Sequence, residues 1–244
     1  IAVERPLEID AESQLLASIM AKKHSVSSTH IIIDVPVNKD SKVKNMLEAL
    51  RLKKEFEKIG RKLKKHVKVL ITDGRQPIGN GIGPALEARD VLWVLKRDPR
   101  GPIDLEKKCL MMCASLFGMV GVKDGYRKAL SILNSGKAYA KMVEIIKAQN
   151  GKEVAAEDIR IGKYCFDVVS AKSGRILDID NVIVSRIARI AGAPHDKGAG
   201  IYLYKHIGSK VKRGEKLFTI YSESRHEFEY AKDVAKSSRV FVTR

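Results

Sequence analysis

The sequence predicts an α/β fold in its first part and a smaller α+β fold in its last part. Two apolar runs, residues 31–37 and 67–72, flank a longer segment whose apolar residues recur at helical spacing. After about residue 158, short alternating segments between turn residues take over. We therefore expect part of a parallel-sheet α/β domain with flanking helices at residues 1–155, and an α+β domain at residues 156–244.

The first elements follow from local sequence. Asp10 can cap a helix over residues 11–24, and apolar side chains at helical spacing mark a second helix over residues 43–59. The run from Ile31 to Val37 is typical of a strand buried on both faces. A strand, a helix and a strand make one βαβ unit, which should be parallel and right-handed.

A glycine-rich loop over residues 73–84 follows the second strand. Gly79, Gly81 and Gly83 allow positive φ and a close approach of the backbone, and Pro84 suits the first position of a helix. The free N–H groups at that helix start could hold an anion. A phosphate cradle and a structural turn are both open readings, because the spacing matches neither GxGxxG nor a P-loop.

The remaining elements are assigned from periodicity and from glycine and proline punctuation. Helices are expected at residues 85–95, 103–119, 123–134 and 137–149. In the last part, strands are expected at residues 163–171, 174–180, 199–205 and 217–222, with a helix at 181–191.

Charge and composition limit the function classes. The net charge is +17 and 44% of residues are hydrophobic, without any apolar run of membrane-spanning length. The charge fits either a nucleic-acid-binding protein or a basic protein with a small phosphorylated substrate. The densest basic cluster, residues 61–66, lacks interleaved aromatic residues, which favours a solvated helix end.

The three cysteines give no disulfide framework. They have an odd count and no CxxC spacing, which indicates a reduced, cytoplasmic setting without a disulfide partner. Cys109 and Cys113 are spaced at i and i+4 in an apolar helical run, so we expect them to pack in the core.

Three segments carry a resemblance to a known family. The run Thr72 to Ala88 is similar to the signature of archaeal AMP phosphorylases. Leu16 to Lys23 resembles the substrate-binding helix of the thymidine phosphorylase family, and residues 192–201 with 208–221 resemble its C-terminal domain. The matches occur in family order and cover nearly the whole chain.

The resemblance implies a glycosyltransferase of the pentosyltransferase class. Such enzymes cleave a nucleoside or AMP with inorganic phosphate as co-substrate, giving a free base and a sugar 1-phosphate or ribose 1,5-bisphosphate. No organic cofactor is implied. Relatives are dimers or larger, so a homo-oligomer without membrane contact is expected.

The resemblance also assigns candidate site residues. Ser18 and Lys22, one helical turn apart, match the serine and lysine that contact the nucleobase, and Arg5 is the nearest candidate for the family's base-contacting arginine. The carbonyls of Ile78 and Gly81 with the carboxylate of Asp90 match a monovalent cation site. The alternative for Asp90 is an ordinary surface carboxylate.

The family's phosphate-binding segment and proton donor have no match in this chain. We therefore expect them upstream, in an N-terminal segment of the same protein, and expect the 244 residues alone to be inactive. The alternatives are a basic nucleic-acid-binding protein or a non-catalytic structural subunit on this scaffold. The sequence pattern of residues 208–217 resembles that of biotinyl and lipoyl carrier domains, which implies a barrel-sandwich-like C-terminal fold. Lys172 lacks the sequence context of a carrier lysine.

Overall fold

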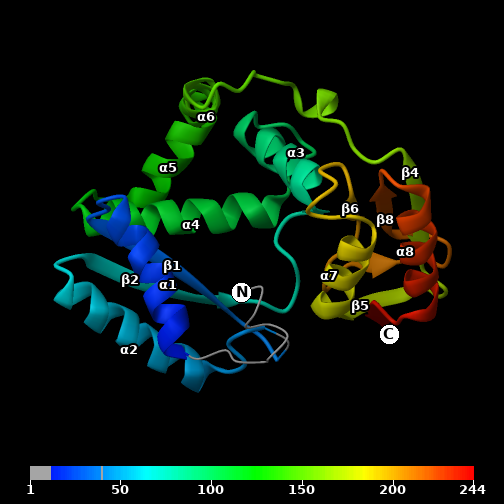
Figure 1. Cartoon of the computed structure of the whole chain (residues 1–244), viewed down its shortest axis with the longest axis horizontal. Helices are drawn as coiled ribbons and strands as arrows, with labels where there is room; N and C mark the ends of the chain where they lie inside the picture. The colour runs from blue at the N-terminus through cyan, green and yellow to red at the C-terminus, as the bar shows by residue number, and fades with distance from the viewer. Residues whose placement is uncertain (1–11, 40) are drawn as a thin grey trace. The chain divides into compact units, whose positions relative to one another are not determined.

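The computed structural model describes residues 12–39 and 41–244 (Figure 1). These residues form a mixed α/β structure of eight α-helices and three sheets within the described part of the chain. The contacts divide the chain into two compact units, residues 1–74 with 112–126, and residues 75–111 with 127–244. The expected boundary near residue 155 falls in the segment between α6, Lys137–Ala148, and β4, Tyr164–Val169, and stays a prediction.

The first unit contains the expected βαβ arrangement. Helix α1 spans Glu12–Ser25, β1 His30–Val37, α2 Met46–Lys62 and β2 His66–Asp73. Strands β1 and β2 pair in parallel from His30 opposite His66 to Val37 opposite Asp73. Leu16 and Met20 of α1 join a buried core with side chains of α2 and both strands. The expectation of a parallel pair is therefore confirmed.

Two details of this unit differ from the sequence analysis. Burial alternates along β1, with Ile31, Ile33 and Val35 buried and the residues between them half-buried, so β1 is not sealed on both faces as expected. The start of α2 is set by Asn45, whose side chain accepts from the N–H of Glu48. The helix therefore begins at Met46 and not at Val43.

Helices fill the middle of the chain. Helix α3 spans Pro84–Leu95, α4 Ile103–Met119, α5 Gly125–Asn134 and α6 Lys137–Ala148. Pro84 occupies the first turn of α3 after Gly83 at φ +133°, as expected for this loop. In the described part of the chain, no helix is long and apolar enough to cross a membrane.

The C-terminal part is built from short strands and two helices. A four-stranded sheet has the order β3-β6-β8-β4, and a three-stranded sheet has the order β7-β5-β9. The strands are β3 Gly81–Ile82, β4 Tyr164–Val169, β5 Gly174–Ile179, β6 Gly200–Leu203, β7 Lys210–Val211, β8 Lys216–Ser222 and β9 Phe241–Thr243. Helices α7, Asn181–Ile190, and α8, Arg225–Ser237, complete this part.

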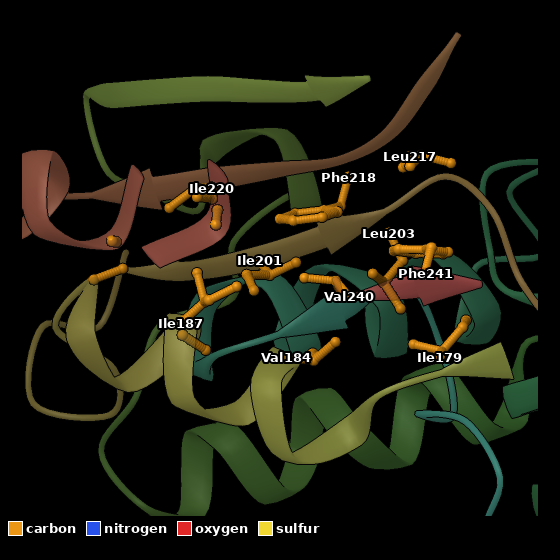
Figure 2. Packing of buried hydrophobic residues seen from close by; sticks show 14 of the residues in the cluster. Ile179, Val184, Ile187, Ile201, Leu203, Leu217, Phe218, Ile220, Val240 and Phe241 are labelled. Carbon is orange, nitrogen blue, oxygen red and sulfur yellow. The ribbon is translucent and has the colours of Figure 1, made fainter. Parts of the chain in front are cut away.

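One continuous core holds the C-terminal part together. Figure 2 shows Val184 and Ile187 of α7 beside Ile201 and Leu203 of β6, with Phe218 of β8 beyond them. All five are at most 1% exposed. Burying an aliphatic or aromatic side chain of this size contributes about 1.5–3 kcal/mol, so this cluster dominates the stability of the region.

Two expectations need correction here. Helix α8 is missing from the sequence analysis, although Ser224 caps it through the N–H of Glu227 and the S-x-x-E spacing is visible in the sequence. Cys109 and Cys113 were expected in the core but are exposed on α4. An apolar helix need not bury a given face, and α4 has a single buried residue, Leu110.

Candidate functional site

Helix α1 presents the two family-matched polar residues on its exposed surface. Leu16 and Met20 face the core, whereas Ser18 and Lys22 are both exposed. Side chains at i and i+4 lie above one another on a helix, so the hydroxyl and the ammonium share one face. Within the described residues Lys22 has no ion-pair partner, which leaves its charge available to a ligand.

The third base-contact candidate, Arg5, lies outside the described residues. Residues 75–84 of the glycine-rich loop belong to the second unit and α1 belongs to the first.

The C-terminal halves of β1 and β2 add polar groups that the sequence analysis did not select. Thr72 donates its hydroxyl to Oδ1 of Asp34 at 2.7 Å, across the two strands. Ligands of open α/β sheets bind at the carboxyl ends of the strands. Asp34 interrupts the apolar run 31–37, and this interruption was the available signal in the sequence.

The glycine-rich loop directs its N–H groups at carboxylates. Asn80 and Gly81 both donate their backbone N–H to Oδ2 of Asp90 at 2.7 Å. Gly79 donates to Oδ2 of Asp104 at 3.2 Å, and Gly83 to Oε1 of Glu87 at 3.0 Å. Each of these donors is already used by a side chain of the protein itself.

This arrangement contradicts the phosphate-cradle reading of the loop. An anion at the start of α3 would need free N–H donors, yet Ala85 donates to the carbonyl of Lys197 at 2.9 Å and Glu87 to that of Gly83. The N–H groups of residues 79, 80, 81 and 83 point to carboxylates that would repel a phosphate. The structural-turn reading therefore holds for this loop.

Asp90 is a buried carboxylate, not the surface group that was the alternative in the sequence analysis. Its side chain is 2% exposed, and Oδ1 has no hydrogen-bond partner among the described residues. Burial raises the pKa of Asp90; hydrogen bonds from Gly81 and Asn80 oppose this shift, and the charge of Asp104 adds to it. An unpartnered buried carboxylate oxygen is a ligand that a hard cation could use.

The described residues contain no group of three or more His, Cys, Asp or Glu side chains with metal-ligand spacing. Any cation at Asp90 would therefore depend mainly on backbone carbonyls, as in the expected set with Ile78 and Gly81. Gly81 is tightly enclosed in the turn, because a Cβ there would lie 2.4 Å from the carbonyl carbon of Leu86.

The C-terminal region fixes the loop through three hydrogen bonds that the sequence analysis missed. Nε2 of His206 donates to Oδ1 of Asn80 at 2.8 Å, because a carbonyl oxygen can only accept. The N–H of Ile207 donates to Oε1 of Gln76 at 2.7 Å, and that of Leu203 donates to the carbonyl of Asn80 at 2.8 Å. These partners are more than 120 residues apart in sequence, so no local pattern reveals them.

The C-terminal part of the chain matches a known domain family. Residues 176–241 match the pyrimidine nucleoside phosphorylase C-terminal domain. The match covers the sixteen buried residues of the C-terminal core, from Ile176 to Phe241. The packing in Figure 2 is therefore the core of this domain.

Similarity to curated relatives extends over the whole chain. The "Putative thymidine phosphorylase" of Rhodopseudomonas palustris is 46% identical over 99% of this chain and 47% of its own length. That of Albidiferax ferrireducens is 44% identical over 98% of this chain and 46% of its own length. AMP phosphorylase 1 of Archaeoglobus fulgidus is 43% identical over 99% of this chain and 48% of its own length.

Residues 176–241 thus carry the sequence of this C-terminal domain. Over nearly its whole length the chain is similar to proteins named putative thymidine phosphorylase and AMP phosphorylase 1, which confirms the resemblance seen in the sequence. It spans about half the length of the curated relatives it matches.

Proposed function

We propose that this chain is part of a phosphorylase that cleaves the N-glycosidic bond of AMP or a nucleoside. An oxygen of inorganic phosphate bonds to the anomeric carbon, the carbon–nitrogen bond breaks, and the base leaves with the bonding electrons and takes up a proton. The products are a free base and ribose 1,5-bisphosphate or a sugar 1-phosphate. The Thr72–Ala88 signature favours AMP over thymidine as substrate.

The observation that carries the proposal is the exposed face of α1. Ser18 and Lys22 stand one turn apart on the surface of a helix whose other side is anchored by Leu16 and Met20. A cation held there would stabilise negative charge that develops on a departing base. Ser18 would orient the base by a hydrogen bond on the same face.

The reaction class is tested on the polypeptide that contains this chain together with its upstream segment. We expect adenine release from AMP that requires phosphate, with thymidine as the comparison substrate. Base release that is indifferent to phosphate would exclude a phosphorylase. Equal turnover by the 244 residues alone would exclude the expected requirement for the upstream segment.

The role of Lys22 is tested with a neighbouring lysine as control. Lys22→Ala should lower kcat/KM by about 100-fold, since one lost charge contact to a transition state costs about 2.7 kcal/mol or more. Lys23→Ala removes the same charge from an exposed position about 100° further round the helix. Its kcat/KM should change less than about twofold, and an equal loss in both variants would refute a specific contact.

We also propose that the carbonyls of Ile78 and Gly81 and Oδ1 of Asp90 hold a monovalent cation. The support is the buried, unpartnered Oδ1. Replacing choline chloride by potassium chloride at constant ionic strength should raise Tm, and Asp90→Asn should abolish the increase. An identical increase in the variant would refute this site.

We propose a homo-oligomeric enzyme in which the upstream segment completes the active site. The support is the half-length match to relatives and the exposed apolar residues of α4 to α6. Sedimentation of the longer polypeptide should give a dimer or larger assembly. A monomer at micromolar concentration with full activity would refute an obligatory oligomer.

A further inference from the structure

The first unit contains a concave basic pocket at the turn between α2 and β2. The pocket has a volume of about 470 Å³, and Arg61, Lys65, His66 and Lys68 supply its positive and imidazole groups. Glu57, Val67 and Met119 complete the lining. All of these residues belong to the same compact unit, so the pocket does not depend on how the two units are placed.

The pocket lies in the most basic segment of the chain. Residues 53–68 contain eight lysines and arginines and two glutamates, a net charge of +6 out of +17 for the whole chain. Like charges that gather without counter-ions destabilise the folded state. Solubility alone therefore does not explain why so much positive charge is concentrated in residues 53–68.

The cations of the pocket are not neutralised by the protein. In the described part of the chain, Arg61, Lys65 and Lys68 form no ion pair. Glu57, one helical turn before Arg61, forms none either, and it supplies the only carboxylate in the lining. The charged side chains that line the pocket therefore carry a net charge of +2, with the imidazole of His66 as a further donor.

The helix dipole explains only part of this cluster. Arg61 lies in the last turn of α2, where a cation stabilises the partial negative charge of the helix end. Lys65 and Lys68 lie beyond that turn, and the dipole effect fades within one turn. Lys65 is also half-buried, which removes water from its ammonium and strengthens its attraction to an anion.

The backbone fixes the positions from which these side chains extend. The turn closes with Lys65 donating its N–H to the carbonyl of Gly60 at 2.8 Å, and Lys64 lies at φ +54°. His66 and Lys68 alternate with Val67 along β2, so they lie on one face of the strand. His66 is further fixed by stacking on His30, with ring centroids 4.6 Å apart. Donors that extend from a fixed turn bind a ligand with less loss of backbone entropy.

We infer that this pocket binds a small anion that carries phosphate groups. Its volume lies within the range of small-molecule sites, and three unpaired cations with an imidazole suit a multiply charged phosphate oxyanion. Apart from the imidazole of His66, no aromatic ring lines the pocket in the described residues, which disfavours a single-stranded nucleic acid. The inference goes beyond the proposed function, because none of these residues is assigned to it.

Calorimetric titration of the 244-residue chain with inorganic pyrophosphate tests the inference. At constant ionic strength we expect saturable binding with one site. The combined variant Arg61→Gln, Lys65→Gln and Lys68→Gln should weaken it at least about tenfold, as expected for the loss of three charge-assisted hydrogen bonds. Glu57→Gln should strengthen binding about twofold or more, because it removes the one repulsive carboxylate.

The matched control removes the same charge outside the pocket. Lys54→Gln, Lys62→Gln and Lys64→Gln alter exposed side chains of the same segment, none of which lines the pocket. This variant should bind pyrophosphate within about twofold of the parent chain. Equal weakening by both triple variants would show diffuse attraction and overturn the inference, as would the absence of saturable binding.

Two further measurements on the parent chain test the inference without any substitution. In the parent chain, pyrophosphate should protect Lys65 and Lys68 from acetylation more than threefold over Lys54, a ratio read by mass spectrometry. Failure to protect them would overturn the inference. A short DNA duplex that binds more tightly than pyrophosphate, with a steep decrease in salt, would assign the basic segment to nucleic acid instead.

Discussion

The C-terminal core and the helices α4 to α6 both come from sequence rich in apolar residues but bury these residues very differently. In the C-terminal region, Ile187, Ile201 and Phe218 are fully buried in one cluster. In contrast, Ile103 at the start of α4 and Val120 just after its end are 67% and 54% exposed, and α6 has no buried residue among its described positions. This difference shows that apolar periodicity identifies a helix but does not show whether its apolar face is buried.

The largest expected effect tests this comparison directly. Phe218→Ala should lower the free energy of unfolding by about 3–5 kcal/mol, because it removes a fully buried ring and leaves a cavity. Ile145→Ala on α6 removes a side chain that is 46% exposed and should cost less than about 1 kcal/mol. Urea unfolding followed by circular dichroism measures both, and similar costs would show that α6 is covered in solution.

Replacing a glycine by alanine should change the free energy of unfolding in opposite directions at Gly81 and at Gly118. Gly81→Ala places a Cβ 2.4 Å from backbone atoms of Leu86 and should destabilise by about 2 kcal/mol. At Gly118 in α4 nothing lies within 4 Å of an added methyl group, and the helix should gain up to about 1 kcal/mol from alanine. Thermal unfolding of both variants would contradict the comparison if Gly118→Ala were the more damaging.

The pH dependence of stability should reveal the buried Asp90. Its pKa is raised above 3.8, so the folded chain binds this proton more tightly than the unfolded chain. Its contribution to stability is therefore greatest at low pH and decreases as the pH rises from near 3.8 through the folded pKa. Asp90→Asn keeps an acceptor for the N–H groups of Asn80 and Gly81 but cannot ionise.

The difference in stability between Asp90→Asn and the parent chain should consequently increase with pH over that window. Urea midpoints at a series of pH values in choline chloride measure it without a competing metal cation. A difference that is independent of pH would show that Asp90 titrates at its ordinary pKa.

The smallest effect concerns ion pairs on the poorly buried helices. Lys141 pairs with Glu144 one turn away on α6, with both side chains more than 60% exposed. Such pairs contribute about 0.5 kcal/mol or less, so Lys141→Ala should leave the urea midpoint almost unchanged. A loss above about 1 kcal/mol would mean that the surface of α6 contributes more than its exposure indicates.

The sequence predicted elements with a strong local signal. The βαβ unit, the helix starting at Pro84 and the helix 103–119 were anticipated because apolar spacing and glycine or proline boundaries are local properties. Strands β3 and β7 have two residues each and exist only through their partners, so no periodicity could reveal them. Helix α8 was missed although its capping signal was present.

The candidate site was less predictable than the fold. Ser18 and Lys22 were found through the family resemblance, and the structure adds that both are exposed. Their roles stay predictions. The burial of Asp90 and the hydrogen bond from His206 to Asn80 depend on contacts between distant segments, so the sequence could not show them.

The hydrogen bonding of the glycine-rich loop has a consequence for interpreting such motifs. Small residues let a backbone turn sharply, but they do not determine the direction in which its N–H and C=O groups then point. Here acidic partners on α3 and α4 draw the N–H groups inward, and a peptide unit that turns its nitrogen to one side presents its oxygen to the other. A glycine-rich loop whose N–H groups point inward presents carbonyl oxygens, which favour cations. Its sequence alone, however, resembles that of loops that bind anions.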